Sequence, residues 1–486
     1  MQIEQNQGIK DSVCSIEHMD RIAIKRRTPK ERLGRGSRVL AAALMVSALP
    51  FGMASGQTAS STEEQRILAF KLVSQGKITS AETVAQALLA SDPGDAMALI
   101  ILSRIRRASN DLTGAQDYAR KAWQSAATPE QKFGAAMEMA RTGNDLDRPV
   151  VAQFWLRRAA QNAPTPELKA QTVRSFRQLR ADNPWRFSFQ FSVAPSSNVN
   201  NGSSEDTIDI GGLPFTLNAV ARSLSGILSI VGGTARYRFD GVNGRPASFT
   251  FSGTYRDVTL SSDAKRSAPD VTGSDYDYAA VELQYGQILH APGASPALRG
   301  DISLGRNWYG GEPLSNYARV GLTAAWSQRK TSATTLSFSI EDQARLDLDA
   351  RSATILRLNA ARLWTAPDGG TLTLSAGLRH TSADAVEVDH KAGLVGLSYG
   401  MARPIAGAVS VKFSLGVEQR LYDRSVFSTD GRRDLRLQGG VTFGFDTLEY
   451  YGFAPQLTLS ATRVNSNIAL YDRQDAAVFI SLRSVF

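Results

Sequence analysis

The hydrophobic and polar positions of the chain follow two different periods, and the change comes near Trp185. In residues 185–486, apolar and polar side chains alternate with a period of two. In the stretch "ASFTFSGTY", for example, Phe249, Phe251 and Tyr255 alternate with serine and threonine. We distinguish about fourteen such segments of about 10–15 residues, a length that is typical of membrane-barrel strands and rare in soluble sandwiches. The pattern therefore predicts a transmembrane antiparallel β-barrel of about 14 strands over residues 185–486.

The connections between these segments alternate in length. Short ones such as "DGVNG", "APDGG" and "RPIAG" alternate with long ones such as "PSSNVNNGSSEDTIDIGGLPF". Outer-membrane barrels have short periplasmic turns and longer outer loops. We therefore expect the first connection to be an outer loop, and we expect the alternation to persist along the chain, with one weaker place near "DTLEYYGFAP".

The last ten residues, "AVFISLRSVF", follow the same alternation. We expect them to form the last strand, which closes the barrel against the first strand near Phe187 to Val193. A terminal phenylalanine is a common address for the barrel-assembly machinery, although Ser484 departs from the aromatic pattern. The positions expected to face membrane lipid and to form this assembly signal are Val478, Ile480, Leu482 and Phe486.

The opposite face of the strands would line a lumen. Its charged positions carry both signs, which favours a wet interior over a selective ion pore; they include Arg256, Glu341, Arg379, Lys412, Glu418, Arg420, Arg436 and Arg483.

Residues 57–184 show a helical period and repeat themselves after 34 residues. In "SQGKITSAETVAQALLASDPGD", the small residues Gly76 and Ala81 have the spacing of a tetratricopeptide (TPR) helix–turn–helix unit. A second unit contains Asn110 and Ala115 at the matching places, and a third unit is irregular at its turn. Such units stack because one unit cannot bury its apolar face, and the stack leaves a concave groove for a peptide or partner helix. The candidate groove residues are Arg66, Phe70, Arg104 and Arg107, with a solvated surface role as the alternative for each arginine.

Residues 1–56 combine a basic run, the apolar stretch "VLAAALMVSALPFGM" and a small-residue exit. This order predicts a secretory signal peptide with an N-terminal extension, in which translation could also start at Met19. The apolar stretch is too short for an ordinary spanning helix, so a membrane anchor is the weaker alternative. Cys14, the single cysteine, lies in this segment, and the exported part would need no disulfide.

Composition and motifs predict no enzyme. The four histidines are scattered, no glycine-rich run is followed by the Lys-Ser/Thr of a phosphate loop, and we expect no metal or cofactor site. The formal net charge is +9, part of which falls in residues 1–56, so nucleic acid is not an expected partner.

The module order resembles the surface lipoprotein assembly modulator (Slam) family, which joins a TPR-type module to a barrel. The most specific stretch is "NPWRFSFQFSVAPSSNVNNGS", and its motif residues are Trp185, Pro195, Ser196, Ser197, Asn198 and Asn200. The resemblance implies an outer-membrane protein that translocates or assembles surface lipoproteins or haemophore-like secreted proteins. It also implies that the helical module lies in the periplasm and receives the substrate, and that outer-membrane lipids surround the barrel.

Two other functions are compatible with this module order. An outer-membrane exporter or porin for polysaccharide or small solutes can also follow a TPR module. A purely structural or adhesive barrel is the third possibility.

Overall fold

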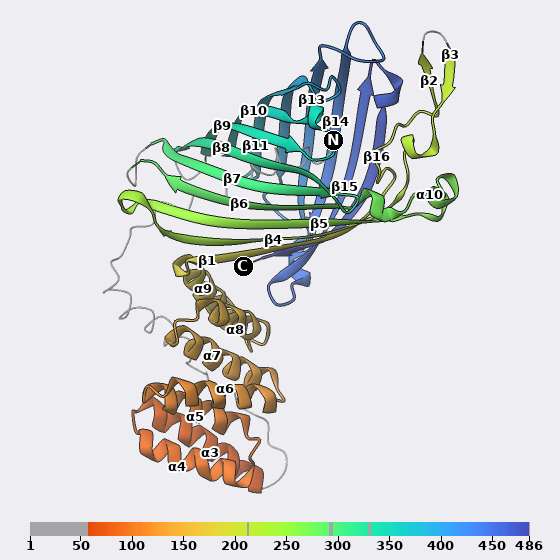
Figure 1. Ribbon diagram of the computed structural model, residues 1–486. Coiled ribbons are helices and arrows are strands. Elements are labelled where there is room, and N and C mark those ends of the chain that lie inside the picture. The colour runs from red at the N-terminus through yellow and green to blue at the C-terminus, as the bar shows by residue number, and fades with distance from the viewer. Residues whose placement is uncertain (1–56, 211–212, 291–294, 329–331, 486) are drawn as a thin grey trace. The chain divides into compact units, whose positions relative to one another are not determined.

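The computed structural model describes residues 57–210, 213–290, 295–328 and 332–485, so the predicted signal segment and Phe486 lie outside the described residues. Figure 1 shows the two kinds of structure that the periodicity predicts. The helical unit ends at Asn183, and the β-barrel begins at Pro184.

The helical unit consists of antiparallel helices of 13 to 18 residues. They are α3 (Gln57–Ser74), α4 (Ile78–Ser91), α5 (Ala96–Ala108), α6 (Leu112–Ser125), α7 (Pro129–Asp145), α8 (Pro149–Gln161) and α9 (Pro166–Asp182). Alanines fill the helix crossings, and Ala81, Ala85, Ala115 and Ala119 are fully buried. The repeat expected from the small-residue spacing is therefore confirmed as a TPR-like stack.

A left-handed residue ends the first helix of each pair. Gly76, Asn110 and Asp147 have φ angles of 74°, 61° and 55°. Gly76 and Asn110 are 34 residues apart, whereas Asp147 follows 37 residues later because α7 has 17 residues where α5 has 13. The longer helix is the physical reason for the irregular third unit.

Fourteen antiparallel strands form one closed barrel. They are β1 (Trp185–Ser196), β4 (Gly226–Asp240), β5 (Pro246–Leu260), β6 (Tyr278–Ile288), β7 (Ala297–Tyr309), β8 (Glu312–Gln328), β9 (Ser332–Arg345), β10 (Ala353–Thr365), β11 (Thr371–Ala383), β12 (His390–Gly400), β13 (Ser410–Tyr422), β14 (Arg432–Gly444), β15 (Phe453–Ser466) and β16 (Arg473–Ser484). The predicted fold class is thus confirmed, because the strand order returns to its start, with β1 between β4 and β16.

The alternation puts apolar side chains on the outside of the barrel. Phe189 on β1, Leu378 on β11 and Leu415 on β13 are 77%, 62% and 61% exposed. At one end of the barrel, outward aromatic rings of β1, β4 and β5 pack together, with Trp185 and Tyr237 4.9 Å apart and Phe239 and Phe249 5.3 Å apart. An apolar band with an aromatic girdle is what a membrane barrel presents to lipid.

We call the end that carries connections 197–225 and 261–277 the loop rim, and the opposite end the turn rim. The expected alternation of connection lengths holds for the first connections and then fails. On the loop rim, residues 384–389 and 467–472 form shorter connections than residues 401–409 and 445–452 on the turn rim. The connection between β7 and β8, also on the loop rim, is shorter still. Only Gly310 and Gly311 connect β7 to β8, and both have positive φ, which glycine adopts without strain. The first long connection contains a separate hairpin of β2 (Thr207–Ile210) and β3 (Leu213–Thr216).

The last strand closes the barrel against β1, as predicted, but the pairing covers only part of the predicted stretch. β1 pairs with β4 along its whole length, from Trp185 to Ser196. With β16, however, the register joins only Ser192 to Ser481, Val193 to Ile480 and Ser196 to Ala477. Pairing with β16 therefore includes Ser192 and Val193 of the predicted stretch and continues to Ser196, whereas the register does not reach Phe187 to Phe191. The Val485 N–H donates to the Gly452 carbonyl at 2.9 Å, directly before β15, which is the neighbour of β16 on its other side.

Candidate functional site

The junction motif at the end of β1 joins β1 to β16, the last strand of the barrel, at the loop rim. The Ser196 and Ser197 hydroxyls donate to the Asp475 carboxylate at 2.7 and 3.3 Å. The Ser197 N–H donates to the Ala476 carbonyl at 3.1 Å, and the Asn198 amide donates to the Gln474 carbonyl at 3.2 Å. These hydrogen bonds therefore hold the first residues of β16 against the end of β1. We call this set of contacts the loop-rim clasp.

Asn200 organises the first long connection. Its amide donates to the Val220 and Arg222 carbonyls at 3.1 and 2.7 Å, and its side-chain oxygen accepts from the Leu224 N–H at 2.8 Å. The other two motif residues are ordinary parts of β1: Trp185 joins the outward aromatic girdle, and Pro195 lies opposite Ile227 of β4. The motif thus has a structural role that its sequence did not indicate.

Charged side chains on β6–β10 form a balanced network inside the barrel. Arg319 pairs with Glu282 and Glu341 at 2.5 and 3.3 Å, and Arg357 pairs with Glu341 at 3.0 Å. The Tyr317 hydroxyl donates to Glu282 at 2.8 Å. This wall has the mixed charge that the sequence predicts.

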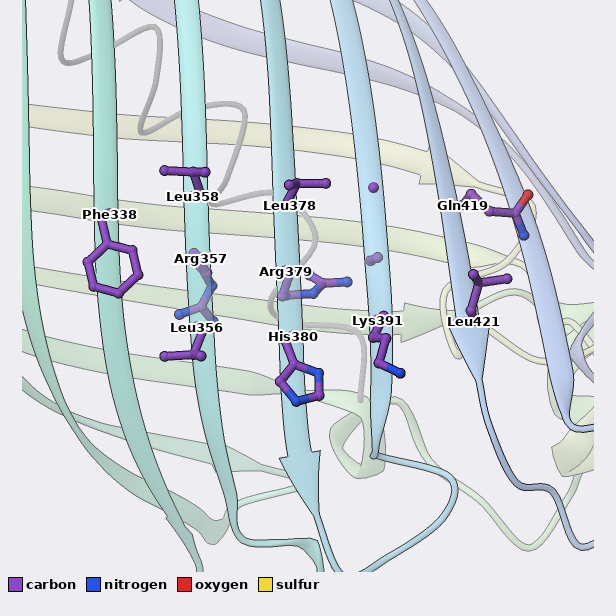
Figure 2. A pocket seen from close by; sticks show the side chains of 12 residues that line it. Phe338, Leu356, Arg357, Leu358, Leu378, Arg379, His380, Lys391, Gln419 and Leu421 are labelled. Carbon is purple, nitrogen blue, oxygen red and sulfur yellow. The ribbon is translucent and has the colours of Figure 1, made fainter.

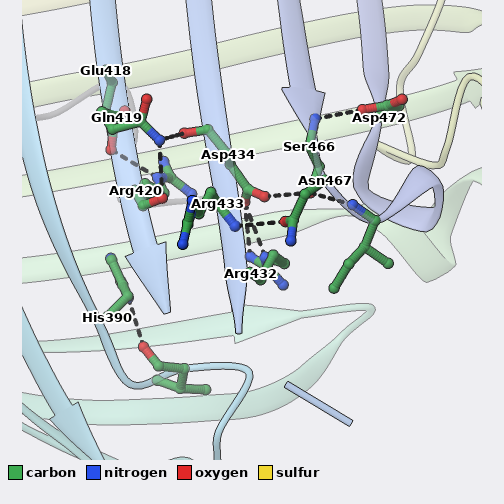
Figure 3. Close-up of polar contacts among 12 residues, drawn as sticks. His390, Glu418, Gln419, Arg420, Arg432, Arg433, Asp434, Ser466, Asn467 and Asp472 are labelled. Atoms are coloured by element: carbon green, nitrogen blue, oxygen red, sulfur yellow. Dashed lines mark hydrogen bonds and ion pairs between the residues drawn. The ribbon is translucent and has the colours of Figure 1, made fainter. Parts of the chain in front are cut away.

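The wall formed by β11–β16 is basic. Arg379 and Arg420 both bind Glu418 there, at 2.7 and 2.8 Å, and Arg432 binds Asp434 at 3.0 Å. Figure 3 shows Glu418 with Arg420 and Arg432 with Asp434, close to the loop-rim ends of the strands. The other basic residues on the lumen face of these strands are Lys412, Arg436, Arg473 and Arg483, and Asp475 of β16 is the further carboxylate. The charge of the lumen is therefore unevenly distributed, and an excess of arginine lies on this side.

A hollow of about 480 Å³ lies on the outer face of β9–β13. Figure 2 shows that leucines and polar groups from neighbouring strands line it. The outward-pointing side chains include Leu356, Leu378, His380, Lys391 and Leu421, and Gly393 leaves space between them. Because outward side chains form most of its lining, the hollow faces the membrane and not the lumen.

The groove candidates of the helical unit are organised around a buried carboxylate. Phe70, Arg104 and Glu138 follow each other at intervals of 34 residues, so they hold the same position in α3, α5 and α7. The Arg104 guanidinium lies 4.4 Å from the Phe70 ring centre and donates to Glu138 at 2.6 Å. The 34-residue period could therefore have revealed Glu138, which the sequence interpretation missed.

The other two candidates also take part in ion pairs. Arg107 lies 3.7 Å from Glu138 and 3.2 Å from Asp145. Arg66 donates at 2.9 Å to Asp95, whose carboxylate also caps α5 through the Met97 and Ala98 N–H groups. These contacts stabilise the repeat stack, and contact of the four candidates with a substrate stays a prediction.

Glu138 is fully buried and is surrounded by three arginines. Burial alone would raise the pKa of its carboxyl group, but the charges of Arg104, Arg141 and Arg107 outweigh burial and hold the pKa below its ordinary value. Glu138 and Asp145 together offset two of the three guanidinium charges, so the cluster keeps one net positive charge.

The assembly-signal residues lie on the outside of β16. Val478, Ile480 and Leu482 are all exposed there, which agrees with the lipid-facing parity, and their role as an assembly signal stays a prediction. Within residues 57–485, gaps excepted, no cluster of three or more His, Cys, Asp or Glu could hold a metal ion. None of the described helices is long and apolar enough to cross a membrane.

Comparison with solved structures returns proteins similar to parts of this chain. The type III secretion translocator chaperone SycD of Yersinia enterocolitica is 24% identical, with 27% of this chain and 93% of that chain covered and a TM-score of 0.22. PcrH of Pseudomonas aeruginosa is 22% identical over 27% and 98% of the two chains, with a TM-score of 0.22. A bacterial polysaccharide outer-membrane secretin is 10% identical over 61% and 98%, with a TM-score of 0.33. No curated protein matches the chain.

The comparison with protein families returns a match in the barrel. A family model described as "Surface lipoprotein assembly modifier" matches residues 304–486, which include β8–β16 and the basic wall. The junction motif at residues 185–200 precedes the matched range. The closed barrel has the architecture of an outer-membrane protein. Residues 304–486 therefore match the surface lipoprotein assembly modifier family, which confirms the resemblance inferred from the sequence.

Proposed function

We propose that this chain assembles lipid-anchored proteins at the cell surface from its place in the outer membrane. The observation that carries the proposal is the family match over nine strands of a closed, outwardly apolar barrel. The substrates would be surface lipoproteins, or soluble haemophore-like proteins of the same export route.

The helical unit would lie in the periplasm and receive the substrate before export. TPR-type stacks bind extended segments in their concave groove. The cluster of Arg104, Arg107 and Arg141 around Glu138 supports an acidic or carboxylate-bearing segment as the ligand. The barrel-assembly machinery would insert the barrel.

Co-expression in a heterologous Gram-negative host tests the proposal. The readout is a candidate lipoprotein that becomes sensitive to protease on intact cells only when this chain is present. Deletion of residues 57–184 should abolish display, while a barrel that still folds in the outer membrane serves as the control. Display at the normal level without the helical unit would reject its receiving role.

Export of an acidic polysaccharide is a second candidate, which the arginine excess on β11–β16 favours. Conductance in planar bilayers separates the two functions. Block by an acidic sugar polymer, together with unchanged lipoprotein display in cells lacking the chain, would support the exporter and contradict the assembly function.

A further inference from the structure

β1 and β16 form hydrogen bonds at the loop rim, but their pairing does not continue towards the turn rim. At the loop rim, the junction motif clasps Gln474, Asp475 and Ala476 of β16. The register with β16 then ends at Ser192 and Ser481. Among the described residues of β1, the stretch from Phe187 to Phe191 pairs with β4 on one side, and the β16 register does not reach it on the other.

Continuation of the observed register defines a closed form of this seam. It would place Leu482 opposite Phe191 and Arg483 opposite Gln190. In the structure, the Arg483 side chain pairs with Asp446, and the Val485 N–H donates to the Gly452 carbonyl on the β15 side of β16. Neither contact occupies the edge of β16 that faces β1, so closure of the seam requires no exchange of partners.

An unpaired strand edge at membrane depth is costly because lipid offers no hydrogen bonds to the backbone. The outward side of this stretch is also strongly apolar, with Phe189 77% exposed. The open edge therefore needs a partner, which can be the chain's own end or a guest segment that enters the seam.

The charged lumen is an unfavourable environment for the acyl chains of a lipid-anchored protein. The barrel interior carries the balanced network of β6–β10 and the basic wall of β11–β16. Such a lumen suits a polypeptide, but it is a poor solvent for acyl chains, whose transfer away from lipid is unfavourable for every buried methylene group. A lipid-anchored substrate therefore needs a route that keeps its acyl chains in the membrane while its polypeptide crosses.

We infer that the seam between Phe187–Phe191 of β1 and the end of β16 is a lateral opening that connects the lumen with membrane lipid. Its occupant is the lipidated end of the exported protein, whose acyl chains stay in the bilayer while the adjoining segment lies along the edge of β1. The loop-rim clasp holds the barrel together during opening. This inference rests on the proposed function and adds to it the path of the lipid anchor.

A reversible disulfide across the seam tests the inference. In a Cys14→Ser background, which leaves the chain without cysteine, the pair Gln190→Cys and Arg483→Cys would lock the seam in its closed register. The matched control is Ser192→Cys with Ser481→Cys, at positions that are already opposite each other. Arg483→Cys alone controls for the loss of the ion pair with Asp446.

The expected result is that the oxidised Gln190–Arg483 pair reduces lipoprotein display to the level of cells without the chain. Display should return on reduction, and the control pair should display normally in both states. A soluble version of the same substrate, without its lipid anchor, should still be exported by the locked barrel.

Three results would overturn the lateral opening. They are normal display by a barrel whose disulfide is complete, failure of the Gln190–Arg483 pair to crosslink when the control pair does, and an equal block of the lipidated and soluble substrates. Failure of the reduced and the unsubstituted chain to display any substrate would instead reject the proposed function.

Discussion

At the scale of single residues, Glu138 is the most sensitive position of the helical unit. It is fully buried and bonded to Arg104 at 2.6 Å and to Arg141 at 2.8 Å. Removal of one partner from a buried ion pair costs about 3–5 kcal/mol because the other charges stay buried without compensation. We expect Glu138→Gln to destabilise the helical unit by about this amount in denaturant unfolding of the full chain, followed by far-UV circular dichroism.

Glu63→Gln is the matched control for that substitution. Glu63 also pairs with an arginine, Arg66, at 3.1 Å, but its side chain is 61% exposed. Exposed pairs contribute about 0–1 kcal/mol. Equal losses from the two substitutions would contradict the central role of the buried cluster.

The lowered pKa of Glu138 also predicts a pH dependence. A carboxyl group whose pKa is lower in the folded than in the unfolded state stabilises the fold above the ordinary value of 4.5, and this contribution is lost as the pH falls through the folded pKa. The unsubstituted helical unit should therefore lose stability on acidification below pH 4.5, and Glu138→Gln should lose less over the same range. Parallel curves for the two proteins would show that Glu138 is not the responsible group.

At the scale of secondary-structure elements, successive residues of β13 point alternately to the lipid and to the lumen. Leu415 faces lipid and is 61% exposed, whereas the neighbouring Ser414 points to the lumen. An arginine on the lipid face near the middle of the membrane costs about 2–4 kcal/mol, and a lumen position tolerates it. We expect Leu415→Arg to lower the stability of the folded barrel in detergent by about that amount, measured by guanidinium unfolding, and Ser414→Arg to have little effect. A larger loss from Ser414→Arg would reverse the assignment of the faces.

The elements that were predictable from the sequence are those with a periodic physical cause. Alternation revealed the strands because each residue faces either lipid or lumen, and the 34-residue period revealed the repeats because small residues must recur at helix crossings. The clasp made by Ser196, Ser197 and Asn198 was not predictable, because its partners on β16 are nearly 280 residues away in sequence. The two-residue connection Gly310–Gly311 was not predicted, because the rule that outer loops are longer than periplasmic turns does not determine the length of any single connection.

At the scale of the whole molecule, the decisive property is the charge of the lumen. Charges of both signs were predicted from the sequence, but which carboxylates neutralise which arginines depends on neighbouring strands. On β11–β16, Glu418 is shared by Arg379 and Arg420, so these arginines are only partly neutralised. The excess of positive charge on this side of the lumen attracts anions.

This excess predicts that the barrel prefers anions when reconstituted in planar bilayers. Under a potassium chloride gradient, the reversal potential should show chloride to be more permeant than potassium, and added salt should weaken the preference because it screens the fixed charges. Neutralisation of the basic wall by Arg420→Gln with Arg473→Gln should reduce the selectivity. Arg106→Gln with Arg120→Gln, which removes two charges from the helical unit, is the matched control and should leave it unchanged. A preference for potassium in the unsubstituted chain would show that the carboxylates of β6–β10, and not the arginines of β11–β16, determine the field along the path that ions take.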